Sequence, residues 1–591
     1  MKKALKIFLP IFVCLLSVII LSSCSDSRDN TVDTTNETLS TEESYGTSGK
    51  CNDTVEWRYD ESTSTFCCFG TGKVTLGIID KDMGHRMRTA ENVRFEEGIT
   101  DAEYSVFSYF DECKSVYIPA SYIGTVPKTE RIEKIIVAEN NPAYSSDEYG
   151  VLFNQDKTEI IRFPACSPIE VYEIPEGVTT IGVGAFDKSV NLKNVVIPNS
   201  ISGISRGAFQ ESSVYLNPEN WEDGLFYVGD CLVEADWETN VEHIVVREGT
   251  RRIEAHAFVY CENIKSITIP DSVEIIGAQA FESCSSLENI YIGSGVREIG
   301  SAPFVFDVEG LPCINLESIE VSDENENYTS VDGVLYNKEM TTLIQYPIGR
   351  KQQEYVIPDT VTTIGYGAFC YCDELTKLTV GKGITVIDYC MLFGCDNMET
   401  VILPETLTVI DSGAFKYSGI KYIDIPDSVT YLGCEAMTAC NRLETVNIGK
   451  GVSFIHEFAI RGSSLKEIRV DPENEFFTSE NGILYNKDKT ELLLYPANKS
   501  GDTYRIPSTV KTIKTAAIMS ANNLREIYLG SNVERIEDAN FYESVPDPER
   551  DFHYETNYVV YFDGTEERWN ELFVNEYERE NIDKSKIRFL Q

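Results

Sequence analysis

Hydrophobic residues recur along this chain with a period of about 23 positions. Residues 174–186 read IPEGVTTIGVGAF, and residues 357–369 read IPDTVTTIGYGAF. With the Ile before each Pro taken as offset zero, apolar residues lie at offsets 0, 4, 7, 12, 18, 21 and 23 of most repeats. Self-similarity at such a period predicts a solenoid, in which each repeat is one turn and buries its hydrophobic face against its neighbours.

Each turn is expected to contribute one short strand. Offsets 21 and 23 are two positions apart, so their side chains lie on the same face of a strand. In the turn that begins at Ile269 these residues are Ile290 and Ile292, and Tyr291 between them is expected to point outward. A Pro, which lacks a backbone N–H, follows many of these strands, at a point where a ladder can end. Strands at identical offsets predict a parallel sheet that follows the solenoid.

Two further offsets predict buried columns of side chains. Offset 12 holds a large apolar residue, and identical offsets should place these residues above one another in a continuous internal spine. The spine residues are Phe186, Phe209, Phe258, Phe281, Phe369, Phe415, Leu392, Met437, Ile460 and Ile518. Offset 15 is often Cys, which we interpret as a small hydrophobe because the CxxC pairs and interleaved His of a zinc site are missing. These residues are Cys261, Cys284, Cys372, Cys395 and Cys440.

A longer unit is interspersed among the regular turns. Residues 145–164, 329–347 and 478–496 each read as strand, polar turn, strand and Pro, which is a hairpin signal. Successive offset-zero positions lie 36 residues apart across the second and third of these units, against 23 in a regular turn. We therefore predict hairpins that are inserted into solenoid turns.

The repeat resembles that of the BspA-like leucine-rich repeat family. Residues 269–292 satisfy nearly every position of the pattern IPxxVxxIGxxAFxxCxxLxxIxIP. The resemblance implies a mostly β repeat solenoid, with a leucine-rich-repeat parallel-sheet arc, inserted β-hairpins and β-type terminal caps. The stretch from Cys51 resembles the hairpin cap that precedes such repeats, and residues 559–573 resemble the closing cap, with Trp569 covering the last turn. Family members are typically cell-surface or secreted binding proteins, and no catalytic residues come with the family.

The N-terminus has the pattern of an export signal. A basic start precedes an apolar stretch, Ile7 to Leu21, that is too short for a stable membrane span and ends in LSSC. This tetrad resembles the bacterial lipoprotein signal, in which Cys24 is acylated; the alternative is an ordinary secretory signal with a chance cysteine. The expected parts are a signal peptide (1–23), a disordered Ser-, Thr- and Asp-rich tether (24–50), an N-terminal β cap (51–92), the solenoid (93–541) and a C-terminal cap (542–591).

The net charge bears on which partners the chain can bind, and the number of cysteines bears on whether it can form a complete set of disulfide bonds. The formal net charge is −44, which argues against nucleic acid because phosphate binding requires clustered Lys and Arg. Of the 17 cysteines, Cys14 lies in the leader and Cys24 at the anchor. The remainder is an odd number, which excludes a complete disulfide framework within one chain.

No catalytic constellation is recognisable in the sequence. The five His are scattered, without an HExxH or triad pattern. The stretch FGTGKVT (69–75) lacks the leading Gly and the Ser or Thr of a phosphate loop. We therefore expect no enzymatic activity, no cofactor and no metal. The acidic stretches 322–327 and 471–475 leave Ca²⁺ binding open beside their interpretation as solvated turns.

One row of residues is expected to point out of the sheet. Its members directly precede the strand-ending apolar residue and share no chemistry, so core packing does not dictate them: Tyr117, Val196, Thr268, Tyr291, Thr379, Ile402, Asp424, Asn447, Arg469 and Tyr528. Tyr offers contact area and a hydroxyl at low entropic cost. The candidate ligand-binding residues are therefore Tyr117, Tyr291 and Tyr528, with Tyr422 two positions earlier in its turn. The alternative is an ordinary solvated sheet face.

These observations favour a non-catalytic binding or adhesion protein, lipid-anchored to the outside of a bacterial membrane. Its partner is expected to be an extracellular protein or glycan from a host, a matrix or a neighbouring cell. The membrane should be contacted only through the lipid, nucleic acid should not bind, and the chain is expected to be a monomer. An envelope spacer, or a carrier or hydrolase acting on polysaccharide, are the alternatives. The hydrolase needs a catalytic domain or a perturbed carboxylate dyad, and the sequence has no non-repeat region of catalytic size.

Overall fold

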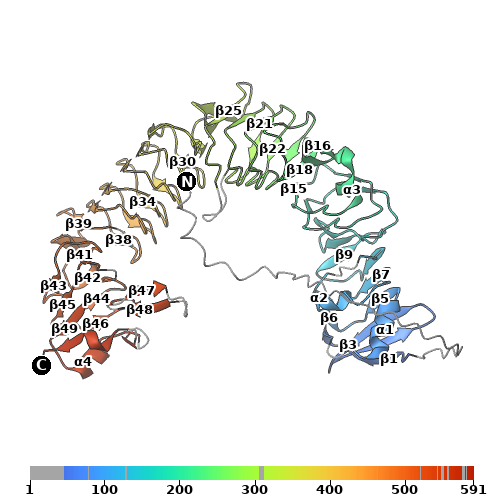
Figure 1. Cartoon of the computed structure of the whole chain (residues 1–591), viewed down its shortest axis with the longest axis horizontal. Coiled ribbons are helices and arrows are strands. Elements are labelled where there is room, and N and C mark those ends of the chain that lie inside the picture. Colours follow the sequence, from blue (N-terminus) through green and yellow to red (C-terminus); the bar gives the residue numbers. More distant parts are fainter. Residues whose placement is uncertain are drawn as a thin grey trace, which may run out of the picture. The chain divides into compact units, whose positions relative to one another are not determined.

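The computed structural model describes residues 45–590, apart from 77–78, 127–129, 305–311, 462–463, 520, 542, 547–551, 556–557, 576–578 and 581; for 543–546 and 552–555 only the backbone is described. From Thr47 onward the chain forms one compact unit, in which strands follow one another in chain order from β1 to β50 (Figure 1). The prediction of a mostly β repeat solenoid is confirmed. The predicted signal peptide, the acylation site Cys24 and most of the tether lie outside the described residues.

Each regular turn contains two short strands instead of the single strand expected. The predicted strand alternates as expected: in β23 (Asn289–Ile292), Ile290 and Ile292 are buried and Tyr291 is exposed. A second strand of two residues lies at offsets 6 and 7. For example, β20 (Arg252–Ile253) pairs in parallel with β22 (Ile275–Ile276) of the next turn. The apolar residue at offset 7 points into the core, and its neighbour points out.

The strands at the end of each turn form the main sheet, which the inserts described below interrupt. Its members are β5 (Asn92–Phe95), β7 (Ser115–Ile118), β8 (Lys134–Val137), β12 (Val171–Glu173), β14 (Asn194–Val196), β19 (His243–Val245), β21 (Ser266–Ile269), β23, β25 (Ser318–Val321), β29 (Glu354–Val356), β31 (Lys377–Thr379), β33 (Thr400–Ile402), β35 (Tyr422–Ile425), β37 (Thr445–Ile448), β39 (Glu467–Val470), β43 (Thr503–Arg505), β45 (Glu526–Leu529), β49 (Val559–Phe562) and β50 (Ile587–Phe589).

The strands at offsets 6 and 7, together with β4 and β6 of the N-terminal part, form the second sheet, which is interrupted at the same places. Its members are β4 (Gly72–Val74), β6 (Ile99–Ala102), β13 (Thr180–Ile181), β15 (Gly203–Ile204), β20, β22, β24 (Glu298–Ile299), β30 (Thr363–Ile364), β32 (Val386–Ile387), β34 (Val409–Ile410), β36 (Tyr431–Leu432), β38 (Phe454–Ile455), β44 (Thr512–Ile513) and β46 (Arg535–Ile536).

Four three-stranded inserts interrupt the solenoid. The three predicted hairpins are confirmed, and each has an additional strand before the predicted pair. The fourth insert, Trp221–Ala235, was missed by the sequence analysis. The inserts are insert 1, with β9 (Tyr144–Ser146), β10 (Leu152–Asn154) and β11 (Glu159–Arg162); insert 2, with β16 (Trp221–Glu222), β17 (Leu225–Val228) and β18 (Cys231–Ala235); insert 3, with β26 (Tyr328–Val331), β27 (Val334–Asn337) and β28 (Thr342–Gln345); and insert 4, with β40 (Phe477–Glu480), β41 (Ile483–Asn486) and β42 (Glu491–Leu494).

The inserts divide the core, so the expected continuous spine is wrong. The middle strand of each insert is buried on both faces. In β27, Leu335 packs into the hydrophobic cluster before the insert, whereas Val334 and Tyr336 pack into the cluster after it. The same alternation at the other inserts yields five clusters. Within a cluster the predicted stacking holds, as in the Phe186 and Phe209 rings, whose centroids are 4.8 Å apart.

Three inserts also cover the edge of the main-sheet strand that precedes them. In insert 3, the Ser330 hydroxyl accepts a hydrogen bond from the backbone N–H of Val321, and the Gly333 carbonyl accepts one from Ile319. Gly333 has a φ of +78°, and a Cβ there would lie 2.8 Å from the Ser318 side chain. Inserts 1 and 4 repeat the arrangement with Ser146 and Gly150, and with Ser479 and Gly482. An exposed strand edge invites pairing with other chains, so this covering protects the solenoid.

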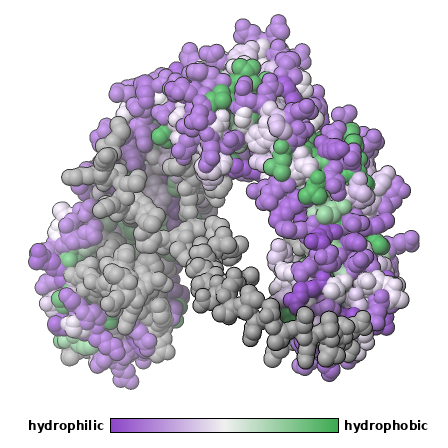
Figure 2. Space-filling model, turned by 45° about the vertical axis from the view of Figure 1, so that its right-hand side comes forward, coloured by the Kyte–Doolittle hydropathy of each residue, from purple (hydrophilic) through white to green (hydrophobic). Residues whose placement is uncertain are grey.

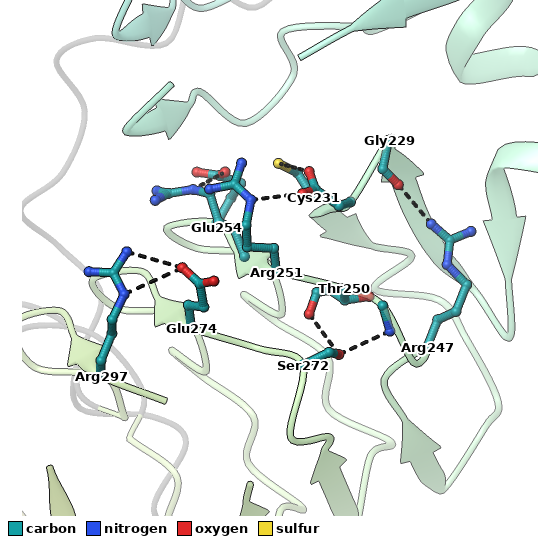
Figure 3. A network of polar contacts seen from close by, with 12 residues as sticks. Gly229, Cys231, Arg247, Thr250, Arg251, Glu254, Ser272, Glu274 and Arg297 are labelled. Atoms are coloured by element: carbon teal, nitrogen blue, oxygen red, sulfur yellow. Dashed lines mark hydrogen bonds and ion pairs between the residues drawn. The ribbon is translucent and has the colours of Figure 1, made fainter. Parts of the chain in front are cut away.

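A buried ion pair spans insert 2. Arg252 lies in β20 and Glu254 directly follows that strand; their Nε and Oε1 atoms are 3.1 Å apart, and both side chains are almost fully buried, with Glu254 labelled in Figure 3. Glu254 also accepts a hydrogen bond from the backbone N–H of Ile204, and the Arg252 guanidinium donates one to the Ser202 carbonyl. Insert 2 interrupts the second sheet after β15. In an uninterrupted turn, the next strand of the sheet would bond these backbone groups of β15 and its neighbours; here the side chains of Arg252 and Glu254 bond them instead.

Both ends of the solenoid are covered. At the N-terminus, β1 (Ser48–Lys50), β2 (Val55–Asp60) and β3 (Thr65–Gly70) are antiparallel, and β3 continues in parallel into β5. Strand pairing thus begins at Ser48, inside the predicted tether. At the C-terminus, Trp569 is buried against Phe541 and Phe562. The remaining elements are α1 (Lys81–Thr89), α2 (Tyr104–Phe107), α3 (Ser213–Leu216), η1 (Pro218–Asn220), β47 (Glu543–Pro546), β48 (Phe552–Glu555), α4 (Glu566–Glu571) and η2 (Lys584–Lys586).

Candidate ligand-binding surface

The outward residues of the main-sheet strands form an open face. Strand alternation fixes which residues belong to it, and parallel pairing aligns them. Thr268 of β21 lies beside Tyr291 of β23, which lies beside Glu320 of β25. The predicted outward row is therefore a row of register neighbours within each sheet. On the face drawn in Figure 2, hydrophobic residues are scattered among hydrophilic ones.

Along the open face, outward residues of similar chemistry lie on consecutive strands, whereas the sequence analysis expected no shared chemistry. From β14 to β33 the row contains exposed apolar side chains, among them Val196, Val245, Val356 and Ile402. From β35 to β39 the row is polar: Asp424, Asn447 and Arg469 lie on adjacent strands, and the Asn447 amide donates a hydrogen bond to Asp424. The row ends in an aromatic and cationic segment, described below.

Tyr291 and Tyr422 present free aromatic surface. Tyr291 is 38% exposed and Tyr422 is 48% exposed. In the part of the chain that the structure describes, neither hydroxyl has a hydrogen-bond partner and neither ring stacks on another. Their register neighbours are small or polar: Thr268 and Glu320 flank Tyr291, and Thr400 and Thr445 flank Tyr422. Both rings can therefore accept a ligand on a face.

Tyr528 is held by its neighbours on both faces. The Arg505 guanidinium carbon lies 3.8 Å from its ring centroid, and the Tyr561 ring is stacked on it at 4.6 Å. The Tyr528 and Tyr561 hydroxyls both donate to the Glu526 carboxylate, at 3.0 Å and 3.4 Å. Desolvation and the bond to Glu526 raise the pKa of Tyr528. Only the edge of its ring remains for a partner.

Tyr117 is an intermediate case, because one of its ring faces is covered. The Arg94 guanidinium carbon lies 4.0 Å above the ring centroid, and Arg94 is itself paired with Glu96. The neighbour on the next strand is Ile136. The four predicted tyrosines thus share an open face but lie in four different sheets, and the structure does not bring them into one site.

The sequence analysis missed three members of the C-terminal segment: Arg505, Glu526 and Tyr561. Tyr561 lies in the stretch that was assigned to the closing cap, yet β49 continues the main sheet in parallel with β45. A usable signal was present, because residues 559–562 alternate between outward and buried positions as the regular strands do. Arg505 directly precedes Ile506 and so has the defining position of the predicted row, but it was left out of that row. Glu526 lies two positions before Tyr528, the place that Tyr422 has in its own strand, and it was not considered there.

The acidic stretches 322–327 and 471–475 are organised by a buried Asn and are not merely solvated turns. The Asn325 amide donates to the carbonyls of Gly293 and Val296, at 2.9 Å and 3.0 Å, and its oxygen accepts from two backbone N–H groups. Asn474 makes the same four bonds in its turn. Among the described residues, no group of three His, Cys, Asp or Glu is arranged to hold a metal ion.

Within the described ranges, no helix has the length and apolar character needed to span a bilayer.

Fold and surface together define a β-solenoid repeat protein with an open sheet face. The sequence pattern of the BspA type leucine-rich repeat region matches in six copies, over residues 157–217, 236–346, 349–481 and 497–547, which is more than half of the chain. The chain belongs to this family. Among curated proteins, none matches the chain.

Several solved structures are similar to this chain. The pneumococcal vaccine antigen PcpA has 19% identity, 82% of this chain and 94% of that chain covered, and a TM-score of 0.37. A leucine-rich cell surface protein from Faecalibacterium prausnitzii has 18% identity, 72% and 96% covered, and a TM-score of 0.34. A leucine-rich repeat protein from Bacteroides ovatus has 15% identity, 82% and 95% covered, and a TM-score of 0.28.

Proposed function

We propose that this chain is an exported, non-catalytic binding protein that recognises an extracellular protein or glycan through the open face of its main sheet. The observation that carries the proposal is the pair of exposed, unpartnered rings of Tyr291 and Tyr422. Exposed β-branched side chains add apolar contact area elsewhere on the same face, among them Val245 and Ile402. Aromatic side chains that lose little entropy on binding are enriched at recognition surfaces, whereas a purely structural sheet face does not need them.

The proposal includes attachment to the outside of a bacterial membrane through a lipid on Cys24. The support is the basic and then apolar leader that ends in LSSC. Acylation anchors a chain through the lipid alone, so the solenoid is free to face the surroundings of the cell. Mass spectrometry of the membrane fraction tests this part. We expect a mature chain that begins at an acylated Cys24, and an unmodified Cys24 in a released chain contradicts it.

The binding face is tested by paired variants. Tyr291→Ser and Tyr422→Ser should leave the melting temperature within about 2 °C of the parent, because both rings are exposed and unpartnered. Each should weaken attachment to matrix proteins, mucin or arrayed glycans by about tenfold, as is usual when an aromatic anchor is removed. Attachment is measured by surface plasmon resonance and array binding, with the ligand class read from the array.

Tyr260→Ser is the matched control, since Tyr260 is 50% exposed but belongs to a connecting turn and not to the sheet. This variant should bind as the parent does. If Tyr291→Ser and Tyr422→Ser also bind unchanged while Tyr260→Ser does not, the ligand sits on the turns and the proposed face is wrong.

A further inference from the structure

A cavity of about 250 Å³ opens beside insert 4, away from the open face described above. Its wall is mostly apolar and includes Phe458, Ile460, Leu494, Tyr495 and Met519. Ile460 belongs to the last regular turn before the insert, and Met519 belongs to the first regular turn after it. The cavity is therefore a gap between two turns that the insert holds apart.

The residues at this junction explain why the gap is not filled. At offset 12, the turns before and after insert 3 contribute Phe304 and Phe369, whereas those around insert 4 contribute the smaller Ile460 and Ile518. The last residue of the insert differs too. In insert 3 it is Gln345, whose amide donates to the Ala368 carbonyl of the following turn; in insert 4 it is Leu494, which cannot donate. Smaller spine residues and a lost polar bridge leave space.

Arg461 enters this space from the turn before the insert. Its Nε donates to the Glu457 carbonyl at 2.7 Å, and its Nη2 donates to the Thr515 carbonyl across the junction at 2.6 Å. The guanidinium carbon lies 4.4 Å from the Phe458 ring centroid. The third nitrogen, Nη1, finds only the Met519 thioether at 3.7 Å, which is a weak acceptor. Arg461 therefore has hydrogen-bonding capacity left on the cavity side.

No described carboxylate contacts this guanidinium directly, although the charge of Glu457 acts on it from a longer distance. In the described part of the chain, no carboxylate lies within ion-pair distance of Arg461, and the one acidic residue of the cavity wall, Glu435, is already paired with Lys416 at 2.6 Å. Burial lowers the pKa of Arg461 to about 10, so the group still carries its charge at neutral pH. A partly buried charge without a counter-ion is costly to maintain, and an anion of the right shape would offset that cost.

We propose that this cavity binds a carboxylate on a compact apolar group, with the carboxylate on Arg461 Nη1 and the apolar group against Phe458, Leu494 and Met519. The guanidinium fork matches a carboxylate in geometry as well as in charge. The volume is sufficient, since a cavity of about 150 Å³ already admits benzene. Such a carboxylate is found on a free aryl or alkyl acid and at the C-terminus of a peptide that ends in an apolar residue.

The test measures binding of three probes to the folded chain by isothermal titration calorimetry and ligand-observed NMR. The probes are 3-phenylpropionate, N-acetylphenylalanine and the neutral 3-phenylpropionamide. We expect at least one acid to bind and to raise the melting temperature, and the amide to bind at least about tenfold more weakly, because the charged hydrogen bond is lost. Preference for 3-phenylpropionate indicates a free acid as the natural source, and preference for N-acetylphenylalanine indicates a peptide terminus.

Two variants locate the site. Arg461→Met keeps the length of the side chain and removes its charge, so it should abolish the preference for acid over amide. Because Arg461 also bonds two carbonyls, this variant could disturb the junction. Ala497→Leu provides a second measurement, since Ala497 is another residue of the cavity wall and its enlargement fills part of the cavity while Arg461 is kept. It should weaken the binding of every probe, with Ala521→Gly, a change in the same turn as Met519 but outside the cavity wall, as the control.

The proposal is overturned if neither acid binds, if acid and amide bind equally, or if Ala497→Leu and the parent bind the acid with the same affinity.

Discussion

At the scale of single residues, side chains that bond backbone groups of a neighbouring turn hold the stack in register. The offset-15 cysteines are one example. The thiols of Cys284, Cys395 and Cys440 donate to the carbonyls of Phe258, Phe369 and Phe415, one turn earlier, at 2.9–3.2 Å. The buried Asn325 and Asn474 each donate two hydrogen bonds to carbonyls of the preceding turn and accept two from N–H groups of their own segment. These positions are small and polar because each fills a fixed place between two stacked turns.

We predict that the offset-15 cysteines remain thiols in the folded protein. A disulfide sulfur has no hydrogen to donate, so oxidation would leave the Phe carbonyls without this bond. Burial also raises the pKa of the Cys440 thiol to about 11, and the thiolate is the form that forms disulfides. Alkylation under denaturing, non-reducing conditions followed by peptide mapping should find all five alkylated. A Cys372–Cys395 disulfide peptide would show the interpretation to be wrong.

Replacing Asn474 should destabilise its junction. Asn474→Ala leaves two buried carbonyls and two N–H groups without partners, which should cost about 2–4 kcal/mol. Glu473→Ala is the matched control, because the neighbouring Glu473 side chain is 77% exposed, and it should cost less than about 0.5 kcal/mol. Native-state hydrogen exchange in residues 467–486 measures both. Equal protection in the two variants would contradict the role of the Asn.

At the scale of elements, the inserts determine what happens at each interruption of the solenoid. Three of them cover the preceding strand edge with a Ser hydroxyl and a Gly carbonyl. Around insert 2, α3 takes the place of a main-sheet strand, and the buried pair of Arg252 and Glu254 satisfies the end of the second sheet. Around insert 4, Arg461 bridges the two turns and leaves a cavity. Inserts 1, 3 and 4 therefore share one way of covering a strand edge, and the ion pair at insert 2 is the exception.

The Glu254 junction should depend on pH. Burial raises the pKa of Glu254 above its ordinary value of 4.5, against the opposing effect of Arg252. A carboxyl group with a raised pKa binds its proton more tightly when folded, so its favourable contribution is full below pH 4.5 and is lost as pH rises through the folded pKa. Compared with Glu254→Gln, which cannot titrate, the parent should therefore lose stability around β15 and β20 as pH rises to neutral.

Denaturant unfolding of both chains between pH 4 and pH 7 measures this difference. The control is Glu274→Gln, because Glu274 is an exposed carboxylate that pairs with Arg297 on the same sheet (Figure 3). An exposed pair contributes less than about 1 kcal/mol, so this variant should follow the parent closely. A parent that gains stability relative to Glu254→Gln as pH rises would contradict the direction given for Glu254.

At the scale of the whole molecule, the solenoid is a series of hydrophobic clusters, called blocks below. An insert with a middle strand buried on both faces lies between each pair of neighbouring blocks. Each insert contributes side chains to the block on either side of it. Neighbouring blocks therefore contact one another only through an insert, and most core side chains pack within one block. In a repeat protein, stability is close to a sum of local terms and nearest-neighbour contacts. Unfolding should therefore proceed block by block, and the effect of a core substitution should stay within its block.

Phe281→Ala tests this division. Phe281 is buried between the Phe258 and Phe304 rings, at centroid distances of 5.4 Å and 5.2 Å. Its truncation should cost about 3–5 kcal/mol. Hydrogen exchange should rise between inserts 2 and 3 and remain unchanged in β43–β50. The control Val183→Ala, at a position that is 78% exposed, should change nothing measurable. Loss of protection along the whole chain would indicate a single cooperative unit instead.

The sequence by itself determined which side chains face the core. Burial repeats at fixed offsets within one turn, so Ile290, Ile292 and Phe281 could be assigned inward and Tyr291 outward without a structure. The hairpins could also be predicted, because alternation and polar turns are local signals. The Asp-Gly and Asn-Gly turns that join the additional strands were equally local and were overlooked. The parallel sheet followed from repetition alone.

The tertiary structure alone decided what depends on contacts between turns. Strands of two residues carry no alternation, so the second sheet was invisible in the sequence. The division of the core follows from inserts that are buried on both faces, which a period cannot reveal. The free rings of Tyr291 and Tyr422 differ from the enclosed ring of Tyr528 only through Arg505 and Tyr561, which are distant in sequence. The Arg461 cavity likewise exists because residues more than 50 positions apart meet across an insert without filling the space between them.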